Sequence, residues 1–300
     1  MFQIYFKQCH LIFIKPCHIN GMQIQKTLNA MFWCFPLTIY SLDADAWGLY
    51  THVYFAQSLL IAAPLLDKRF REAIKRFPEL VMAGACLPDL AVISKKFSTT
   101  HQWQKAEYLI QNAETLEETA VAIGYANHLY VDVIAHNHFV PAHEALWAHE
   151  SIFTHIASEW AMDVHIEKSL RNTPGQLLST HATFISHFIA PCFEQPQRLV
   201  KNKLMTLAYA DRLLRSVKLP NIIHQCIHFN NRKKHKHFNY YINETKNALT
   251  SFHKVLNGHR PNWHPELPVI EDLTRISIWR KHCLETMHIN HAEPIRYYAD

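Results

Sequence analysis

Two pairs of metal-binding side chains recur in this sequence at the spacing of one helical turn. His128 and Asp132 stand four residues apart, and so do His155 and Glu159. On a helix this spacing puts both side chains on one face, roughly 5–6 Å apart at Cβ, where they can share or bridge a metal ion. Imidazole and carboxylate together suit Zn²⁺. Either pair alone is weak evidence, because similar pairs form hydrogen bonds on ordinary helix surfaces.

Further candidate ligands lie earlier in the chain. His52 precedes the two pairs, as do His101 and Asp89, which follows Pro88. Each has an ordinary alternative, since an aspartate in such a place often caps a helix or a turn and an isolated histidine is often only solvated. After Asp132 come two more histidines. His136 continues the four-residue spacing of residues 128 and 132, and His138 lies just beyond it. Single positions therefore decide little, and the set must be judged together.

The first 46 residues indicate a leader with a cleavable signal peptide. An apolar run at 30–42 is too short to cross a bilayer core of about 30 Å as a helix. It is followed by Ala44-Asp45-Ala46, the kind of site that signal peptidase cuts. Cleavage there would make Trp47 the first residue, and its free amino group and carbonyl could chelate a metal. An uncleaved anchor or a buried helix is the alternative, and Met22 is a candidate true start.

The composition favours helices and is compatible with an anionic partner. Thirty basic residues against 25 acidic ones give a net charge of +5. This is too weak a charge to indicate a nucleic-acid coat, but it is compatible with an anionic substrate or a membrane surface. Only six glycines and a large number of histidines, 23, are present. Long stretches lack turn residues, and no run alternates with the period of a strand.

The expected architecture is all-α, in a single compact multi-helix domain over residues 47–300 behind the 1–46 leader. Helices are predicted at 51–60, 68–82, 101–111, 114–134 and 143–170, and helical stretches continue to the end. Leu87 to Leu90 is predicted as a loop, and Pro141 is expected to end the region that begins at residue 114. The four cysteines after the leader permit two disulfides in an exported protein, with three possible pairings. They are Cys86, Cys192, Cys226 and Cys283.

Taken in chain order, the candidate ligands form a recognisable series. They are Trp47, His52, Asp89, His101, His128, Asp132, His138, His155 and Glu159. This series resembles the motif of the zinc-dependent phospholipase C family and of the related single-strand-specific zinc nucleases. Those are all-helical enzymes with three zinc ions in a cleft, and their motif begins with an N-terminal Trp. The resemblance covers roughly residues 47–165. The spacing of the family motif favours His138 over His136.

The resemblance implies three ligand groups for three zinc ions. One group is Asp89, His101, His128 and Asp132. A second consists of the Trp47 amino nitrogen and carbonyl, His52 and the shared Asp132. The third is His138, His155 and Glu159. The ammonium form of Trp47 cannot bind metal, so cleavage and proton loss are expected to accompany binding.

The implied activity is that of a secreted or periplasmic zinc-dependent phosphodiesterase using zinc-activated water. Asp89 is the candidate to orient the water or act as a base. Phospholipase C-like hydrolysis of a phospholipid head-group ester is favoured, with possible contact to a membrane surface. The alternatives are a single-strand-specific nuclease, whose partner would be nucleic acid, and a non-catalytic zinc-binding surface protein. Aromatic side chains that could line a substrate pocket are Tyr50, Phe55, Phe97, Trp103 and Tyr130.

Overall fold

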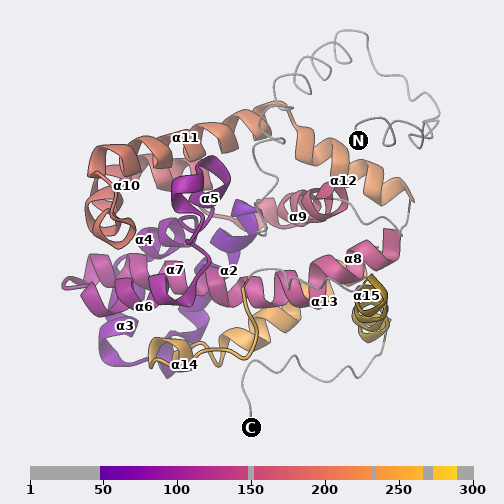
Figure 1. The fold of residues 1–300 in the computed structure, drawn as a ribbon, viewed down its shortest axis with the longest axis horizontal. Helices are drawn as coiled ribbons and strands as arrows, with labels where there is room; N and C mark the ends of the chain where they lie inside the picture. Colours follow the sequence, from indigo (N-terminus) through magenta and orange to yellow (C-terminus); the bar gives the residue numbers. More distant parts are fainter. Residues whose placement is uncertain (1–47, 148–151, 231–233, 266–272, 289–300) are drawn as a thin grey trace.

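The computed structural model describes residues 48–147, 152–230, 234–265 and 273–288 (Figure 1). The α-helices are α2 (Leu49–Ala62), α3 (Lys68–Arg76), α4 (Pro78–Gly84), α5 (Leu90–Ile93), α6 (Trp103–Asn112), α7 (Leu116–Ile134), α8 (Val140–Trp147), α9 (Ile152–Ile166), α10 (Pro174–Ile189), α11 (Gln197–Ser216), α12 (Leu219–Asn230), α13 (Lys234–Leu249), α14 (His253–Leu256) and α15 (Leu273–His288). Short 3₁₀ turns are η1 (Ala63–Leu65), η2 (Lys95–Phe97), η4 (Glu167–Ser169) and η5 (Pro191–Phe193), and η3 (Ala135–Phe139) is a π-helical segment.

Helix α7 is the central element of this fold (Figure 1). Every residue from Thr119 to Ile134 is buried. Its start is fixed by a capping box, in which the Thr115 hydroxyl accepts from the Glu118 N–H and the Glu118 carboxylate accepts from the Thr115 N–H. Helices α2, α3, α4 and α6 all pack on α7. The two ligand positions of α7 therefore lie deep in the protein, away from bulk water.

Glycine lets α4 approach α7 at backbone contact distance. A Cβ on Gly84 would lie 2.3 Å from the Val121 carbonyl oxygen, and one on Gly124 would lie 2.0 Å from the Val81 carbonyl oxygen. Neither separation is sterically possible, so both positions need a residue without a side chain. This close packing brings the turn after α4, which carries Asp89, towards α7.

The remaining helices pack around this centre. Helices α10 and α11 form an antiparallel pair, and α12 packs on α9 (Figure 1). Helix α15 lies beside α8, where Arg280 pairs with Glu144 at 2.8 Å. Across the described residues the protein contains helices and turns and no strand. The all-α, single compact multi-helix arrangement predicted from the sequence is therefore confirmed. No helix in these residues is both long and apolar enough to span a membrane.

Two boundary predictions were wrong, and both concern proline. The stretch 68–82 is two helices rather than one, because Pro78 starts α4 and the chain turns at Phe77. Pro141 does not end a helix but lies near the start of α8, directly after the π-helical segment η3. The predicted loop around Pro88 is confirmed. The leader and its cleavage site fall outside the described residues, so the 1–46 boundary stays a prediction.

The cysteines differ from the expectation as well. Cys86, Cys192 and Cys283 are free and buried. The two disulfides that the even cysteine count permitted are thus not formed among these three residues.

Candidate metal centre

The Asp132 carboxylate lies at the middle of a buried cluster of imidazoles. The His128 Nε2 atom is 2.9 Å from Oδ2, and the His52 Nε2 atom is 3.2 Å from Oδ1. The rings of His52 and His128 stack with centroids 3.5 Å apart. Asp132, His52 and His128 all have an exposed fraction of 0%. One atom from each of the three residues lies within 4.8 Å of the others, which is close enough to hold one metal ion.

A second group shares His128 and adds two residues from the segment between α4 and α6. The His101 Nε2 atom is 3.2 Å from the His128 Nε2 atom, and the Asp89 Oδ1 atom is 3.8 Å from it. The His101 Nε2 atom also lies 3.6 Å from Asp132 Oδ2. Asp89, His101 and His128 again place one atom each within 4.8 Å. The first two groups are therefore fused through α7.

Helix α9 supplies most of the third group. The His155 Nε2 atom is 2.7 Å from Glu159 Oε1, as the four-residue spacing predicts. The ring of His136 faces that of His155 with centroids 5.5 Å apart. The His136 Nε2 atom is also 3.7 Å from Asp132 Oδ1, which connects this group with the first. His136, His155 and Glu159 satisfy the same 4.8 Å criterion.

The structure brings His136 into the third group and leaves His138 out of it. The His138 ring packs edge-on against Trp263, with centroids 5.5 Å apart, and its backbone carbonyl accepts a hydrogen bond from Tyr241. The physical reason is that the helix does not end after Asp132. It continues through η3 into α8, so the four-residue spacing of His128 and Asp132 extends to His136. His138 as a ligand, chosen on the motif spacing, stays a prediction, and the geometry of the third group favours His136.

Hydrogen bonding orients one shared ligand. The His128 Nδ1–H donates to the Ala85 carbonyl oxygen at 2.8 Å, just after α4. This bond fixes the tautomer, so that in the neutral ring Nε2 carries the lone pair and faces Asp132 and His101. The glycine contacts between α4 and α7 hold that carbonyl in place.

Burial and neighbouring charges control the protonation of the cluster. Burial, reinforced by His128, lowers the pKa of His101 to about 3, and burial also lowers the pKa of His136 well below its ordinary value. Burial alone would raise the pKa of Asp132, but His128 and His52 hold it well below its usual range. Burial raises the pKa of Asp89 to about 8, against the opposing effect of His128. At neutral pH the His101 and His136 imidazoles are therefore neutral, the form that binds metal.

The donor set fits a divalent cation such as zinc. Buried polar atoms without a hydrogen-bond partner include both Oδ atoms of Asp132, Oδ1 of Asp89 and both ring nitrogens of His136. The ion-pair contacts of Asp132 within the described residues are all with imidazoles. Unpartnered buried groups are costly unless a ligand satisfies them. Imidazole and carboxylate donors are those that zinc prefers.

Other predicted residues have different outcomes. Trp47 lies outside the described residues, so its role as a ligand stays a prediction. The aromatic side chains considered for a substrate pocket are instead part of the core, with exposed fractions of 6% or less. These are Tyr50, Phe55, Phe97, Trp103 and Tyr130. These side chains pack against other apolar residues of the core, a role that the helical periodicity of apolar residues could have predicted.

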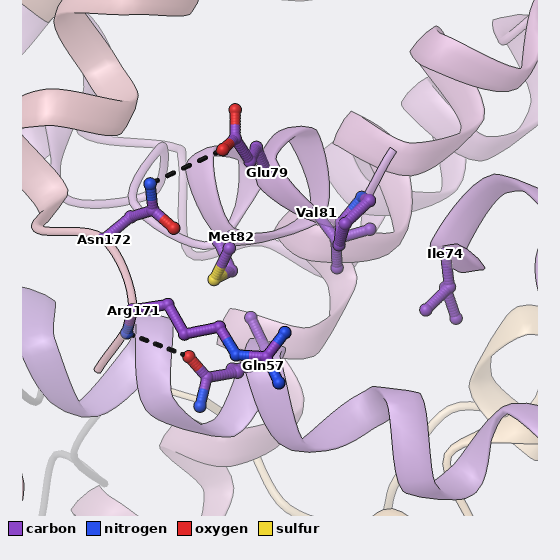
Figure 2. A pocket seen from close by; sticks show the side chains of 9 residues that line it. Gln57, Ile74, Glu79, Val81, Met82, Arg171 and Asn172 are labelled. Atoms are coloured by element: carbon purple, nitrogen blue, oxygen red, sulfur yellow. Dashed lines mark hydrogen bonds between the residues drawn. The ribbon is translucent and has the colours of Figure 1, made fainter. Parts of the chain in front are cut away.

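A small pocket lies elsewhere, between α2, α4 and the segment that follows η4 (Figure 2). Its volume is about 130 Å³. Arg171 donates its backbone N–H to the Gln57 side chain at 3.2 Å, and Asn172 reaches Glu79 at 3.5 Å (Figure 2). None of its lining residues belongs to the three metal-binding groups. This pocket is therefore separate from the candidate metal centre.

The model of the family described as "Zinc dependent phospholipase C" matches residues 51–257. The chain belongs to the zinc-dependent phospholipase C family. All eight residues of the three groups in the structure, from His52 to Glu159, fall inside the matched span. The relation to the zinc nucleases is consistent with the all-helical fold. Neither the curated proteins nor the solved structures that were searched gave a match.

Proposed function

We propose that this protein is a zinc-dependent phosphoric ester hydrolase that cleaves the head-group ester of a phospholipid, as a phospholipase C does. The observation that carries the proposal is the set of three adjoining groups of buried imidazole and carboxylate side chains, in a member of the zinc-dependent phospholipase C family. Phosphoryl transfer depends mainly on positioning and charge stabilisation, and such a centre can supply both.

The proposed ligand set holds three zinc ions. Asp89, His101 and His128 bind one ion, and His52 and Asp132 bind the second together with the Trp47 amino nitrogen and carbonyl. Asp132 also lies within reach of the first group, through the contact of 3.6 Å between its Oδ2 atom and His101 Nε2. The third ion is held by His136, His155 and Glu159.

Bound zinc would supply Lewis acidity towards phosphoryl oxygens and would lower the pKa of bound water towards about 7. The protein's own residues do the positioning. His128 is held by the Ala85 carbonyl, so its Nε2 lone pair has one direction. Asp89 keeps Oδ1 free of hydrogen-bond partners, which makes this oxygen the atom that orients the attacking water or takes its proton. The buried helices around α7 exclude bulk water.

The proposal includes export and maturation at Trp47. Helix α2 begins at Leu49, two residues after Trp47, and His52 lies in its first turns. A free amino group at residue 47 would thus be joined by a short, fixed stretch of chain to a ligand of the Asp132 group. A phospholipid at a membrane surface is the proposed partner.

The test uses protein that begins at Trp47, verified by N-terminal sequencing. Zinc content is measured by elemental analysis, and phosphocholine release from phosphatidylcholine vesicles is compared with cleavage of single-stranded DNA. About three zinc ions per chain with faster phospholipid hydrolysis supports the proposal. Cleavage of DNA alone would assign the chain to the nuclease activity instead. Zinc binding without turnover of either substrate would contradict the proposed activity.

A matched variant tests the amino-terminal ligand. Adding one methionine before Trp47 blocks the free amine at that residue while leaving every side chain in place. We expect weaker zinc binding at one site and lower activity, with an unchanged circular dichroism spectrum. Full activity of the extended protein would exclude the Trp47 amine as a ligand.

A further inference from the structure

A second buried carboxylate, Asp163 on α9, holds the first turn of α2. Its Oδ1 atom accepts hydrogen bonds from the Thr51 N–H at 2.9 Å and from the Thr51 hydroxyl at 2.8 Å. The Asp163 side chain is fully buried. The first helical N–H groups lack the partner of a helix interior, and the Thr51 N–H is shared between the Gly48 carbonyl at 2.9 Å and Asp163. A carboxylate there also interacts favourably with the positive end of the helix dipole. Asp163 therefore caps α2 from a different helix.

Glycine at position 48 makes room for this cap. A Cβ on Gly48 would lie 2.3 Å from Asp163 Oδ2 and 2.5 Å from Oδ1. Any other residue would have to displace the carboxylate or the chain. Position 48 directly precedes α2, where Ser, Thr, Asp or Asn ordinarily provides the capping side chain. Here the local side chain is absent, and the cap comes from Asp163, which lies 112 residues after Thr51 in the chain.

Arg215 of α11 also binds Asp163, and we call Asp163, Thr51 and Arg215 together the anchor of α2. The Nη2 atom of Arg215 donates to Asp163 Oδ2, and its Nε lies 3.5 Å from Asp211 Oδ1. The guanidinium carbon also lies 3.9 Å from the ring centroid of Tyr50, in the first turn of α2. Asp163 is thus neutralised and oriented by α11 while it binds α2. The three helices meet at one carboxylate.

The position of this anchor links two parts of the metal centre. Asp163 follows Glu159 by four residues, so it lies on the same face of α9, one turn beyond the third group. Thr51, which it binds, directly precedes His52 of the first group. The anchor therefore connects the helix that carries His155 and Glu159 to the start of the helix that carries His52.

We propose that Asp163, supported by Arg215 and by the glycine at position 48, is a positioning residue for the metal centre. It fixes the start of α2 so that His52 reaches the Asp132 group. The inference rests on the proposed function, since it concerns the same centre. Among the described residues Asp163 binds Thr51 and Arg215, so its effect on the centre passes through the Thr51 backbone and hydroxyl.

The principal experiment compares Asp163→Asn with Asp211→Asn in protein that begins at Trp47. Both variants remove a buried carboxylate from Arg215, but only Asp163 contacts α2. Zinc affinity is measured site by site, by competition with a chelating dye. We expect Asp163→Asn to weaken one of the zinc sites by about 10-fold or more, the size found when a group that orients a metal ligand is lost, and Asp211→Asn to bind zinc as the unaltered protein does. Equal zinc affinity in all three proteins would overturn the inference.

A second pair of variants decides the question if Asp163→Asn does not fold. Thr51→Val has nearly the same shape and removes only the hydroxyl donor to Asp163, whereas Thr51→Ser keeps that donor. Weaker zinc binding at one site in Thr51→Val, restored in Thr51→Ser, supports the positioning role. Equal affinity in both variants, with circular dichroism showing folded protein, would overturn it. Absence of zinc binding by the unaltered protein would instead refute the proposed function itself.

Discussion

Two fully buried aspartates, Asp132 and Asp163, have opposite surroundings. Asp163 is met by the Arg215 guanidinium and by two donors of Thr51. Asp132 is surrounded by imidazoles, and neither of its oxygens has a hydrogen-bond partner. Each carboxylate lies one helical turn after a candidate metal ligand, Asp132 after His128 and Asp163 after Glu159. Their environments differ in where the compensating positive charge comes from.

This difference separates a structural site from a binding site. A buried charge is stable only when it is paired and hydrogen-bonded. For Asp163 the chain supplies both, and the result is a fixed connection between α2, α9 and α11. For Asp132 the chain supplies mainly lone pairs on neighbouring imidazoles, which suits a cation from outside. Polar residues that look alike in the sequence thus serve two purposes.

The largest predicted effect comes from removing the carboxylate that lacks a partner. Asp132→Asn should lower hydrolysis of the phospholipid by at least about 100-fold, more than the usual loss from a group that only orients a ligand. The reason is that Asp132 lies within 3.2 Å of His52 and 2.9 Å of His128, so two groups lose a negatively charged ligand. Zinc content and turnover are measured together, with Asp211→Asn as the control. Full activity in Asp132→Asn would refute the three-zinc assignment.

The next effect distinguishes the two histidines that follow Asp132. His136→Gln should lose about one zinc ion per chain and about 10-fold or more in activity, because His136 lies beside His155 in the third group. His138→Gln should keep its zinc and lose only the edge contact with Trp263, which is worth about 1 kcal/mol of stability. Elemental analysis and thermal unfolding measure both. Loss of zinc in His138→Gln alone would restore the original choice.

His136 and His138 show which ligand positions could be predicted from the sequence. The four-residue spacing predicted the pairs in α7 and α9 correctly, since helical periodicity is a local property. For the third group the motif spacing chose His138, whereas the structure places His136 beside His155 and Glu159, because the helix continues through a π-helical segment and past Pro141. A proline near a helix start and one near its end look the same in a sequence. His136 could have been found by extending the spacing of His128 and Asp132 by one more turn.

Long-range contacts mark the limit of that reasoning. Asp163 binds a threonine 112 residues earlier in the chain and an arginine 52 residues later. No local pattern links these three residues, and the missing capping side chain at Gly48 was the only signal nearby. The sequence also suggested a substrate-binding role for aromatic residues that the structure places in the core. Tyr130 and Phe55 looked available for a substrate but pack in the core, because burial depends on what the other helices cover.

A smaller effect concerns Asp89, which differs from Asp132 in its protonation. Burial raises the pKa of Asp89 to about 8, so the zinc-free protein holds this carboxyl neutral at pH 7. The unfolded chain ionises this carboxyl at pH 7, so folding without zinc must take up a proton, and Asp89→Asn should therefore raise the unfolding free energy of the zinc-free protein. With zinc present, it should remove about 3 kcal/mol of stabilisation, as a 100-fold loss of affinity would. Urea unfolding with and without zinc tests this, and equal losses in both conditions would contradict it.

The smallest predicted effect concerns Asp211, which shares Arg215 with Asp163. Asp211 is the more distant partner of Arg215, at 3.5 Å. Burial raises the pKa of Asp211 from 3.8 to about 6, since Arg215 opposes that rise only in part and Asp163 adds to it. The folded protein thus keeps this proton to a higher pH than the unfolded chain. The stability from this group is complete below about pH 4 and is lost as the pH rises through about 6.

Asparagine at position 211 cannot ionise, so it isolates this contribution. The unfolding free energy of Asp211→Asn, relative to the unaltered protein, should rise by about 2 to 3 kcal/mol between about pH 4 and pH 7, following the size of the pKa shift. Urea unfolding of zinc-free protein measures the difference without interference from zinc release. A difference that stays constant across this range would mean that Arg215 neutralises both carboxylates equally. Arg215 would then stabilise the charge of Asp163 no more than that of Asp211. Asp163 and Asp211 would have equivalent surroundings, and only Asp132 would differ in lacking a partner of opposite charge.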